Sequence, residues 1–186
     1  MDKTDNQHGN FIGFPFYVFL TIILGSIGIF GFMAHWETGQ STLAILIAIL
    51  VAAHIGLHWL NNTLNSTRWW IFYYTVQTVI LVAIAILPSN GDAAAFGLTF
   101  LGTGIISMIG EALGIWGNSR RALFLGLFYT LLLIGVFVIK VDSDQLINHL
   151  SQLVVNGGFI VIIMVIFNQQ LQERRKAEEL AETLES

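Results

Sequence analysis

The stretch LAILIAILVAA, residues 43–53, is eleven consecutive apolar residues that carry no charge and do not alternate with polar positions. A membrane-spanning helix needs about 20 mostly apolar residues, whereas a membrane β-strand alternates between lipid-facing and interior-facing residues. The apolar composition continues on both sides of this stretch, over roughly residues 42–60. Because backbone groups in lipid must be hydrogen-bonded within the protein, we predict a membrane-spanning helix here.

The whole chain shares this apolar character. Of its 186 residues, 55% are hydrophobic and only 11% are charged, and the mean hydropathy is +0.72. Soluble domains carry about 25% charged residues, so this sequence has too little polar material to cover a water-facing surface. We therefore expect an all-α polytopic membrane protein. The absence of cysteine excludes disulfides, thiolate metal sites and cysteine nucleophiles.

Short polar links divide the chain into six apolar segments of span length. These segments cover roughly residues 12–34, 42–60, 69–87, 94–116, 122–140 and 148–168. Short links favour antiparallel neighbours. The predicted fold is therefore a six-helix antiparallel transmembrane bundle over residues 12–168, preceded by a cytoplasmic N-terminal segment, residues 1–11.

The basic residues are distributed unevenly between the two sides of this predicted bundle. Of the eight Lys and Arg residues, seven fall on the side of the two termini, and only Lys140 falls opposite. Cytoplasmic links of membrane proteins carry the excess of Lys and Arg. We therefore predict a multi-pass protein with both termini in the cytoplasm.

The last apolar segment continues without Gly or Pro into a charged C-terminal stretch, residues 169–186. Its residues are mostly good helix formers, so we predict that the sixth helix extends into the cytoplasm as a juxtamembrane signalling helix. Three cations are placed to contact lipid headgroups: Arg174, Arg175 and Lys176. A heptad-like seam of apolar residues consists of Ala177, Leu180 and Leu184. Towards the membrane, the polar residues Gln170 and Glu173 interrupt this seam. Such a seam would favour a homodimer. A solvated single helix is the alternative.

This layout resembles the membrane input region of bacterial sensor histidine kinases, especially the DesK-like type that pairs with NarL-type regulators. The resemblance rests on the apolar spans, the cytoplasmic termini and the stretch QERRKAEELAETLES, residues 172–186. It implies a sensor in the bacterial inner membrane that passes a bilayer or intramembrane stimulus through the sixth helix. The expected partners are the lipid bilayer, a downstream kinase domain in a longer chain and a response regulator, with no nucleic acid.

The family's catalytic motifs do not occur in these residues. None of the five His residues precedes an acidic residue, and ATP-binding glycine motifs are absent from the sequence. We therefore expect no enzymatic activity from this chain itself. A small transporter or channel is a rival class, although the two halves show no internal repeat of the kind that many transporters contain.

Four polar side chains interrupt the apolar spans: His54, His58, Gln77 and Glu111. The two histidines are four residues apart and share one helical face. We expect His54, Gln77 and Glu111 at one depth, with His58 nearer the membrane surface. Ionisable residues within spans are costly and typical of functional sites.

Three interpretations of these side chains remain open. In the first, the side chains form a hydrogen-bonded clamp between helices. In the second, they form a proton- or ion-responsive pair. In the third, His54 and His58 bind a metal ion, a haem or a quinone. In a metal site Glu111 would supply the third ligand. We expect no bound cofactor or metal, and we keep the metal or haem site as the alternative.

Glycines and loop-end residues complete the sequence predictions. Small residues let helices approach closely in lipid, and we expect this of the glycines in the first and fourth spans. Gly157 and Gly158 in the sixth span predict a bend or rotation point in the signalling helix. Near the opposite membrane face, His35 and its acidic neighbours are expected to be solvated loop ends.

Overall fold

The computed structural model describes residues 5–61, 66–88, 91–116, 119–141, 151, 173, 176–178, 180–181 and 183–184. Within these ranges all regular structure is α-helical, and five helices are long and apolar enough to cross a membrane. The helices are α1 (Asp5–Glu37), α2 (Ser41–Asn61), α3 (Thr67–Ile86), α4 (Gly91–Trp116) and α5 (Arg120–Lys140). The prediction of an all-helical chain is confirmed for this part, and the five helices agree in length and composition with a multi-pass membrane protein.

The remaining sequence predictions fall partly outside the described ranges. The sixth span, residues 148–168, lies outside them, as do Gly157 and Gly158 within it. The same holds for Gln170, Arg174 and Arg175 in the C-terminal stretch. At the other end, α1 begins at Asp5, within the segment that we expected to precede the first span.

Local sequence signals explain where several helices begin and end. Ser66 caps α3, since its hydroxyl accepts a hydrogen bond from the backbone N–H of Trp69 at 3.2 Å. Ser119 caps α5 in the same way. Between α1 and α2 the chain reverses at Gly39, whose φ of 76° is easily adopted only by glycine. A tight link of this kind makes α1 and α2 an antiparallel pair.

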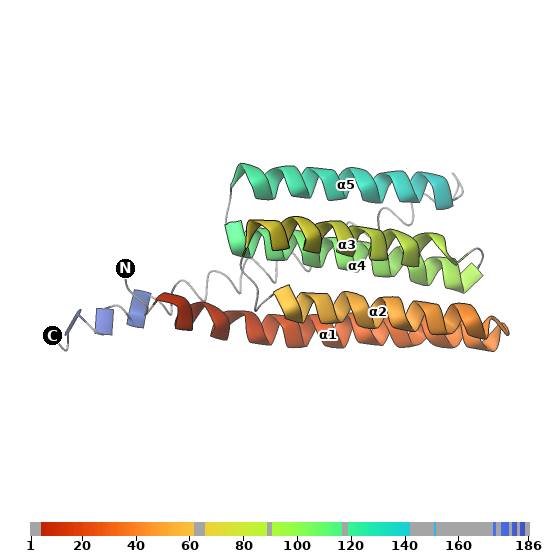
Figure 1. Cartoon of the computed structure of the whole chain (residues 1–186), viewed down its shortest axis with the longest axis horizontal. Coiled ribbons are helices and arrows are strands. Elements are labelled where there is room, and N and C mark those ends of the chain that lie inside the picture. Colours follow the sequence, from red (N-terminus) through yellow and green to blue (C-terminus); the bar gives the residue numbers. More distant parts are fainter. Residues whose placement is uncertain are drawn as a thin grey trace.

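The first four helices form a ring in which each helix contacts two neighbours. Helix α1 packs against α2 and α4, and α3 completes the ring by packing against α2 and α4. Helices α2 and α4 therefore face each other across the centre of the ring. Helix α5 lies outside it, against α4 and more lightly against α3 (Figure 1).

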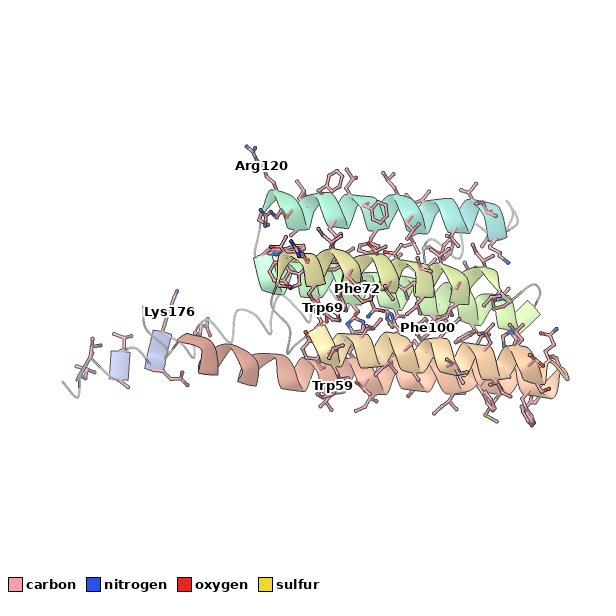
Figure 2. The ribbon with its side chains drawn as sticks, viewed as in Figure 1. Trp59, Trp69, Phe72, Phe100, Arg120 and Lys176 are labelled. Carbon is pink, nitrogen blue, oxygen red and sulfur yellow. The ribbon has the colours of Figure 1, made fainter. Side chains whose placement is uncertain are left out.

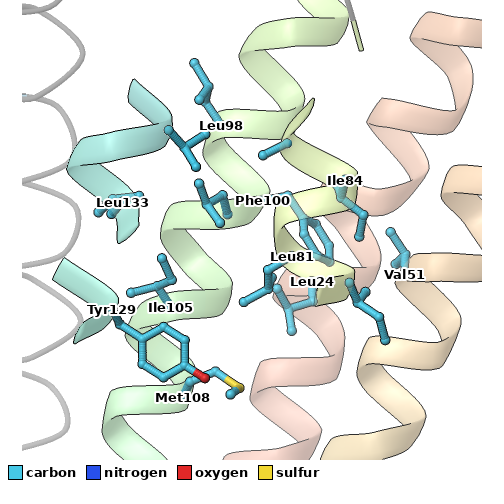
Figure 3. Packing of buried hydrophobic residues seen from close by; sticks show 14 of the residues in the cluster. Leu24, Val51, Leu81, Ile84, Leu98, Phe100, Ile105, Met108, Tyr129 and Leu133 are labelled. Atoms are coloured by element: carbon cyan, nitrogen blue, oxygen red, sulfur yellow. The ribbon is translucent and has the colours of Figure 1, made fainter. Parts of the chain in front are cut away.

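The interior of the ring combines aromatic and branched aliphatic side chains. Leu24, Leu81 and Phe100, from three different helices, are fully buried, and Figure 3 shows them in one cluster. The outward-facing side chains are also apolar: Ile29, for example, is 62% exposed. An apolar exterior matches a lipid environment rather than water, so tight packing and polar contacts must distinguish the inside from the outside.

Glycines allow two of these helix contacts. A Cβ on Gly97 of α4 would lie 2.8 Å from the backbone oxygen of Ile84 in α3. A Cβ on Gly28 of α1 would lie 2.6 Å from the Val51 side chain of α2. The expectation that glycines in these spans mark close packing within the chain is confirmed at these two positions.

Candidate functional site

The four polar side chains that the sequence singled out meet at the centre of the ring. His54 and His58 project from α2, Gln77 from α3 and Glu111 from α4, and none of the four is more than 5% exposed. Figure 2 shows side-chain nitrogen atoms gathered between the helix layers, in the region between the labelled Trp69 and Phe100. The site therefore lies within the membrane-spanning part of the ring.

Gln77 fixes the tautomer of His54. The Gln77 side-chain nitrogen donates to the backbone oxygen of His54 at 3.0 Å, which leaves the amide oxygen facing Nδ1 of the same histidine at 2.5 Å. An amide oxygen only accepts hydrogen bonds, so Nδ1 of His54 must carry a proton. In the neutral ring the opposite nitrogen, Nε2, is then an acceptor.

His58 continues the chain of hydrogen bonds. Its Nε2 lies 3.2 Å from Nε2 of His54, and since the His54 atom accepts, the His58 atom donates. Ser107 of α4 places its hydroxyl oxygen 3.3 Å from the same His58 nitrogen. Both ring nitrogens of His54, and Nε2 of His58, thereby acquire defined roles.

The other nitrogen of His58 meets a carboxyl group. Nδ1 of His58 lies 2.8 Å from one oxygen of Glu111, the single ion pair among the residues that the structure describes. The Tyr73 hydroxyl donates to the other Glu111 oxygen and lies 2.7 Å from the same Nδ1. Tyr17 of α1 lies close enough to Glu111 to interact with it electrostatically. Helices α2, α3 and α4 thus contribute the hydrogen bonds of this polar network.

These contacts determine how many protons the network holds. One proton lies between Nδ1 of His58 and the facing oxygen of Glu111. If His58 carries it, the pair is imidazolium and carboxylate, and if Glu111 carries it, both groups are neutral. The network is neutral overall in both cases. Adding or removing one proton would leave a net charge in a site shielded from water, which is costly.

The sequence predicted part of this arrangement. The sequence placed His54, Gln77 and Glu111 at one depth and His58 nearer the membrane surface. In the structure His54 pairs with Gln77, whereas Glu111 pairs with His58, one helical turn further along α2. Glu111 is therefore linked to His54 only through His58. Ser107 was not singled out, although it precedes Glu111 by one helical turn and so shares its face. Tyr73, which the sequence places one helical turn before Gln77, bonds to Glu111.

The hydrogen bonds of His54, His58 and Glu111 bear on the alternative that these side chains bind a metal ion. His58 uses one nitrogen toward His54 and the other toward Glu111, so the side chains bond directly to one another. Within the described ranges no group of three or more His, Asp or Glu side chains is arranged to hold a metal ion. The described network is complete as a hydrogen-bonded unit of protein side chains.

His35 differs from the expectation of a solvated loop end. It lies in the last turn of α1, yet it is fully buried. Its Nδ1 bonds to the backbone oxygen of Gly31 at 2.7 Å, and its ring meets Phe96 of α4 edge-on. The missing Cβ of Gly31 explains the burial, since a side chain there would overlap Phe96.

The described part of the C-terminal stretch is helical and exposed. Glu173, Lys176, Ala177, Leu180 and Leu184 all belong to it. The two leucines of the predicted seam are 63% and 86% exposed, respectively. The seam residues therefore remain available to a partner.

No known protein family, curated protein or solved structure matches this sequence.

Proposed function

We propose that this chain is the membrane-embedded sensory region of a two-component sensor histidine kinase of the bacterial inner membrane. In this proposal six antiparallel helices form the bundle, and both termini are cytoplasmic. The sixth helix passes the state of the bundle to a downstream kinase module. The exposed Leu180 and Leu184 would pair with a second copy, giving a homodimer.

The observation that carries the proposal is the neutral network around His58 and Glu111. It is built from groups that exchange protons, and it bonds α2, α3 and α4 to one another at the centre of the ring. The titratable groups around the pair are Tyr17 from α1, His54 from α2, Tyr73 from α3 and Glu111 itself from α4. A change of one proton would weaken contacts between these helices together.

This property makes the network a two-state element. When the network is neutral overall, directional hydrogen bonds across the ring hold the helices together. With one proton too many or too few, the least costly response is a helix shift that opens the site to water or to a counter-charge. We propose that such a shift changes the tilt or rotation of the sixth helix and hence the exposed C-terminal seam.

A spin label on the signalling helix tests the proposal. Because the chain contains no cysteine, a single Leu184→Cys change gives one labelling position. In proteoliposomes taken from about pH 8 to pH 5, on either side of the pKa of a free imidazole group, we expect the label's mobility and its distance to the label of a second copy to change.

Glu111→Gln is the matched change within the network. The nitrogen of the introduced amide can donate to His58 and its oxygen can accept from Tyr73, so every hydrogen bond keeps a partner with one proton fewer. We expect this variant to fold and to lose the pH response. His35→Gln alters a buried histidine outside the network and should keep the response.

Two outcomes would count against the proposal. An unchanged label response in the Glu111→Gln protein would remove the network as the sensing element. Proton flux through proteoliposomes that contain the wild-type chain, abolished by Glu111→Gln, would instead favour the transporter class, in which intramembrane carboxylates and histidines relay protons.

A further inference from the structure

A groove runs along the outer face of α3 and α5, away from the polar network. It has a volume of about 680 Å³, within the range of about 300–1,000 Å³ that small-molecule sites occupy. Its walls are apolar and accessible: Ile71 and Val79 on α3 are 66% and 63% exposed, and Phe124 on α5 is 73% exposed. Among the residues that the structure describes, the groove is therefore open along the outer apolar face of α3 and α5.

Two cations mark one end of this groove. Arg120 and Arg121 begin α5 and line the groove, and both are exposed. Figure 2 shows Arg120 extending away from the end of the helix. The single ion pair within the described ranges involves neither arginine, so no described carboxylate neutralises this pair of charges.

Polar groups near the same end also lack partners. Tyr74 and Trp116 line the groove, and their rings lie 5.5 Å apart. The Tyr74 hydroxyl and the Trp116 indole nitrogen are buried, and no described residue bonds to either. Buried donors usually have an acceptor. Ester oxygens of a lipid sit at this level, below the headgroup and next to the aromatic rings that favour the interface.

We propose that the groove binds an anionic phospholipid, with its phosphate at Arg120 and Arg121 and one acyl chain between α3 and α5. The charge pair selects the headgroup, and the apolar walls hold the chain. Basic pockets between membrane helices recognise anionic lipids by the same combination. This lipid site is separate from the network around Glu111 and does not depend on the proposed signalling function.

Tryptophan fluorescence tests the proposal, because Trp70 and Trp116 both line the groove. The wild-type chain is reconstituted in phosphatidylcholine nanodiscs that contain increasing fractions of phosphatidylglycerol brominated near the ester group. Brominated phosphatidylcholine serves as the reference quencher. We expect phosphatidylglycerol to compete roughly 30-fold better for the groove, about fivefold for each arginine.

Three variants separate the groove from general surface charge. The double change Arg120→Gln and Arg121→Gln should abolish the preference. Arg68→Gln removes a cation from the first turn of α3 that does not line the groove, and it should retain the preference. Thr75→Phe fills the groove without changing charge and should abolish the preference while circular dichroism remains that of the wild type.

The proposal is overturned if both lipids quench the wild-type fluorescence equally. It is also overturned if Arg68→Gln reduces the preference as much as the double change does, since the lipid would then respond to surface charge alone. A preference that survives Thr75→Phe would likewise place the lipid elsewhere. Trp116→Phe must reduce the phosphatidylglycerol-specific quenching if the groove is the site.

Discussion

The polar centre of the ring and the surface of α5 use different means to hold helices together in lipid. In the centre, side chains from α2, α3 and α4 form a continuous chain of hydrogen bonds that includes the His58–Glu111 pair. Helix α5 has far fewer polar contacts with its neighbours: Tyr129 bonds to Thr78, and Lys140 donates to the backbone oxygens of Ile86 and Pro88. Tyr129 also donates to the backbone oxygen of Tyr74, and most other described contacts of α5 with the ring are apolar.

This difference has consequences for specificity. Lipid tails are as apolar as the side chains of α5, so burying those side chains against the ring gives little net driving force. Apolar packing therefore tolerates small shifts of α5. The hydrogen bond between His58 and Glu111 at the centre of the ring does not, because a shift of α2 by one residue would separate the two side chains. We infer that the network fixes the register of the ring.

The largest effect is expected at Glu111. Replacing Glu111 with Leu removes the carboxyl group that His58 and Tyr73 share and leaves these two side chains only each other as partners at that position. Removal of one member of a buried ion pair costs about 3–5 kcal/mol in soluble proteins, and we expect about 3 kcal/mol of unfolding free energy here. Steric-trap unfolding in bicelles measures the change.

Glu111→Gln is the control, because its amide satisfies the same groups. The free energy of unfolding of the Glu111→Gln protein should lie within about 1 kcal/mol of that of the wild type. Equal stability of the Leu and wild-type proteins would show that the network does not hold the ring together. Polar bonding would then no longer distinguish the way the ring is held together from the way α5 is held.

The fold was largely predictable because its signals are local. Apolar length and polar links predicted the helices now seen as α1–α5, with ends that differ by a few residues except at Asp5, where α1 begins well before the predicted start at residue 12. The order of the helices around the ring was not predictable, because helices that are apolar on all sides have no amphipathic pattern to indicate which helix packs against which. Only contacts such as that of Gly97 with the Ile84 backbone reveal that α3 and α4 are adjacent.

The candidate site was predictable by type but not by connection. His54, His58, Gln77 and Glu111 stand out because polar groups inside a span are rare. Their order in the network depends on rotations of α2 and α4 that the sequence does not encode locally. His35 shows the same limit, since its burial depends on Gly31 and on Phe96 of a distant helix.

An intermediate effect is expected at Gly97, where α3 and α4 meet without intervening side chains. Gly97→Ala would place a methyl group 2.8 Å from the backbone oxygen of Ile84, and a backbone atom cannot move aside alone. Overpacking costs about 1–3 kcal/mol, and we expect roughly 2 kcal/mol of lost stability in the same unfolding measurement.

Gly126 in α5 offers the matched control for Gly97. A Cβ on Gly126 meets no atom within 4 Å, so Gly126→Ala should leave stability unchanged or raise it by up to about 1 kcal/mol through helix propensity. A larger loss at Gly126 than at Gly97 would contradict the distinction between a closely packed ring and a loosely held α5.

The smallest effect is expected at Tyr129, which forms the central polar contact of α5. Its hydroxyl lies 3.0 Å from the Thr78 hydroxyl and 3.4 Å from the backbone oxygen of Tyr74. Thr78 also donates to that backbone oxygen, at 2.7 Å, so Tyr129→Phe strands no buried group. Hydrogen bonds between membrane helices average about 0.6 kcal/mol, and we expect a loss of that size.

A double-mutant cycle with Thr78→Val isolates the bond between Tyr129 and Thr78 from packing changes. Its coupling free energy should be several times smaller than that of a cycle between His58 and Glu111, because the second pair is charged or shares a proton whereas the first is neutral. If the two coupling energies were equal, directional bonding would hold α5 as firmly as the ring. The network would then no longer account for the difference between the two regions.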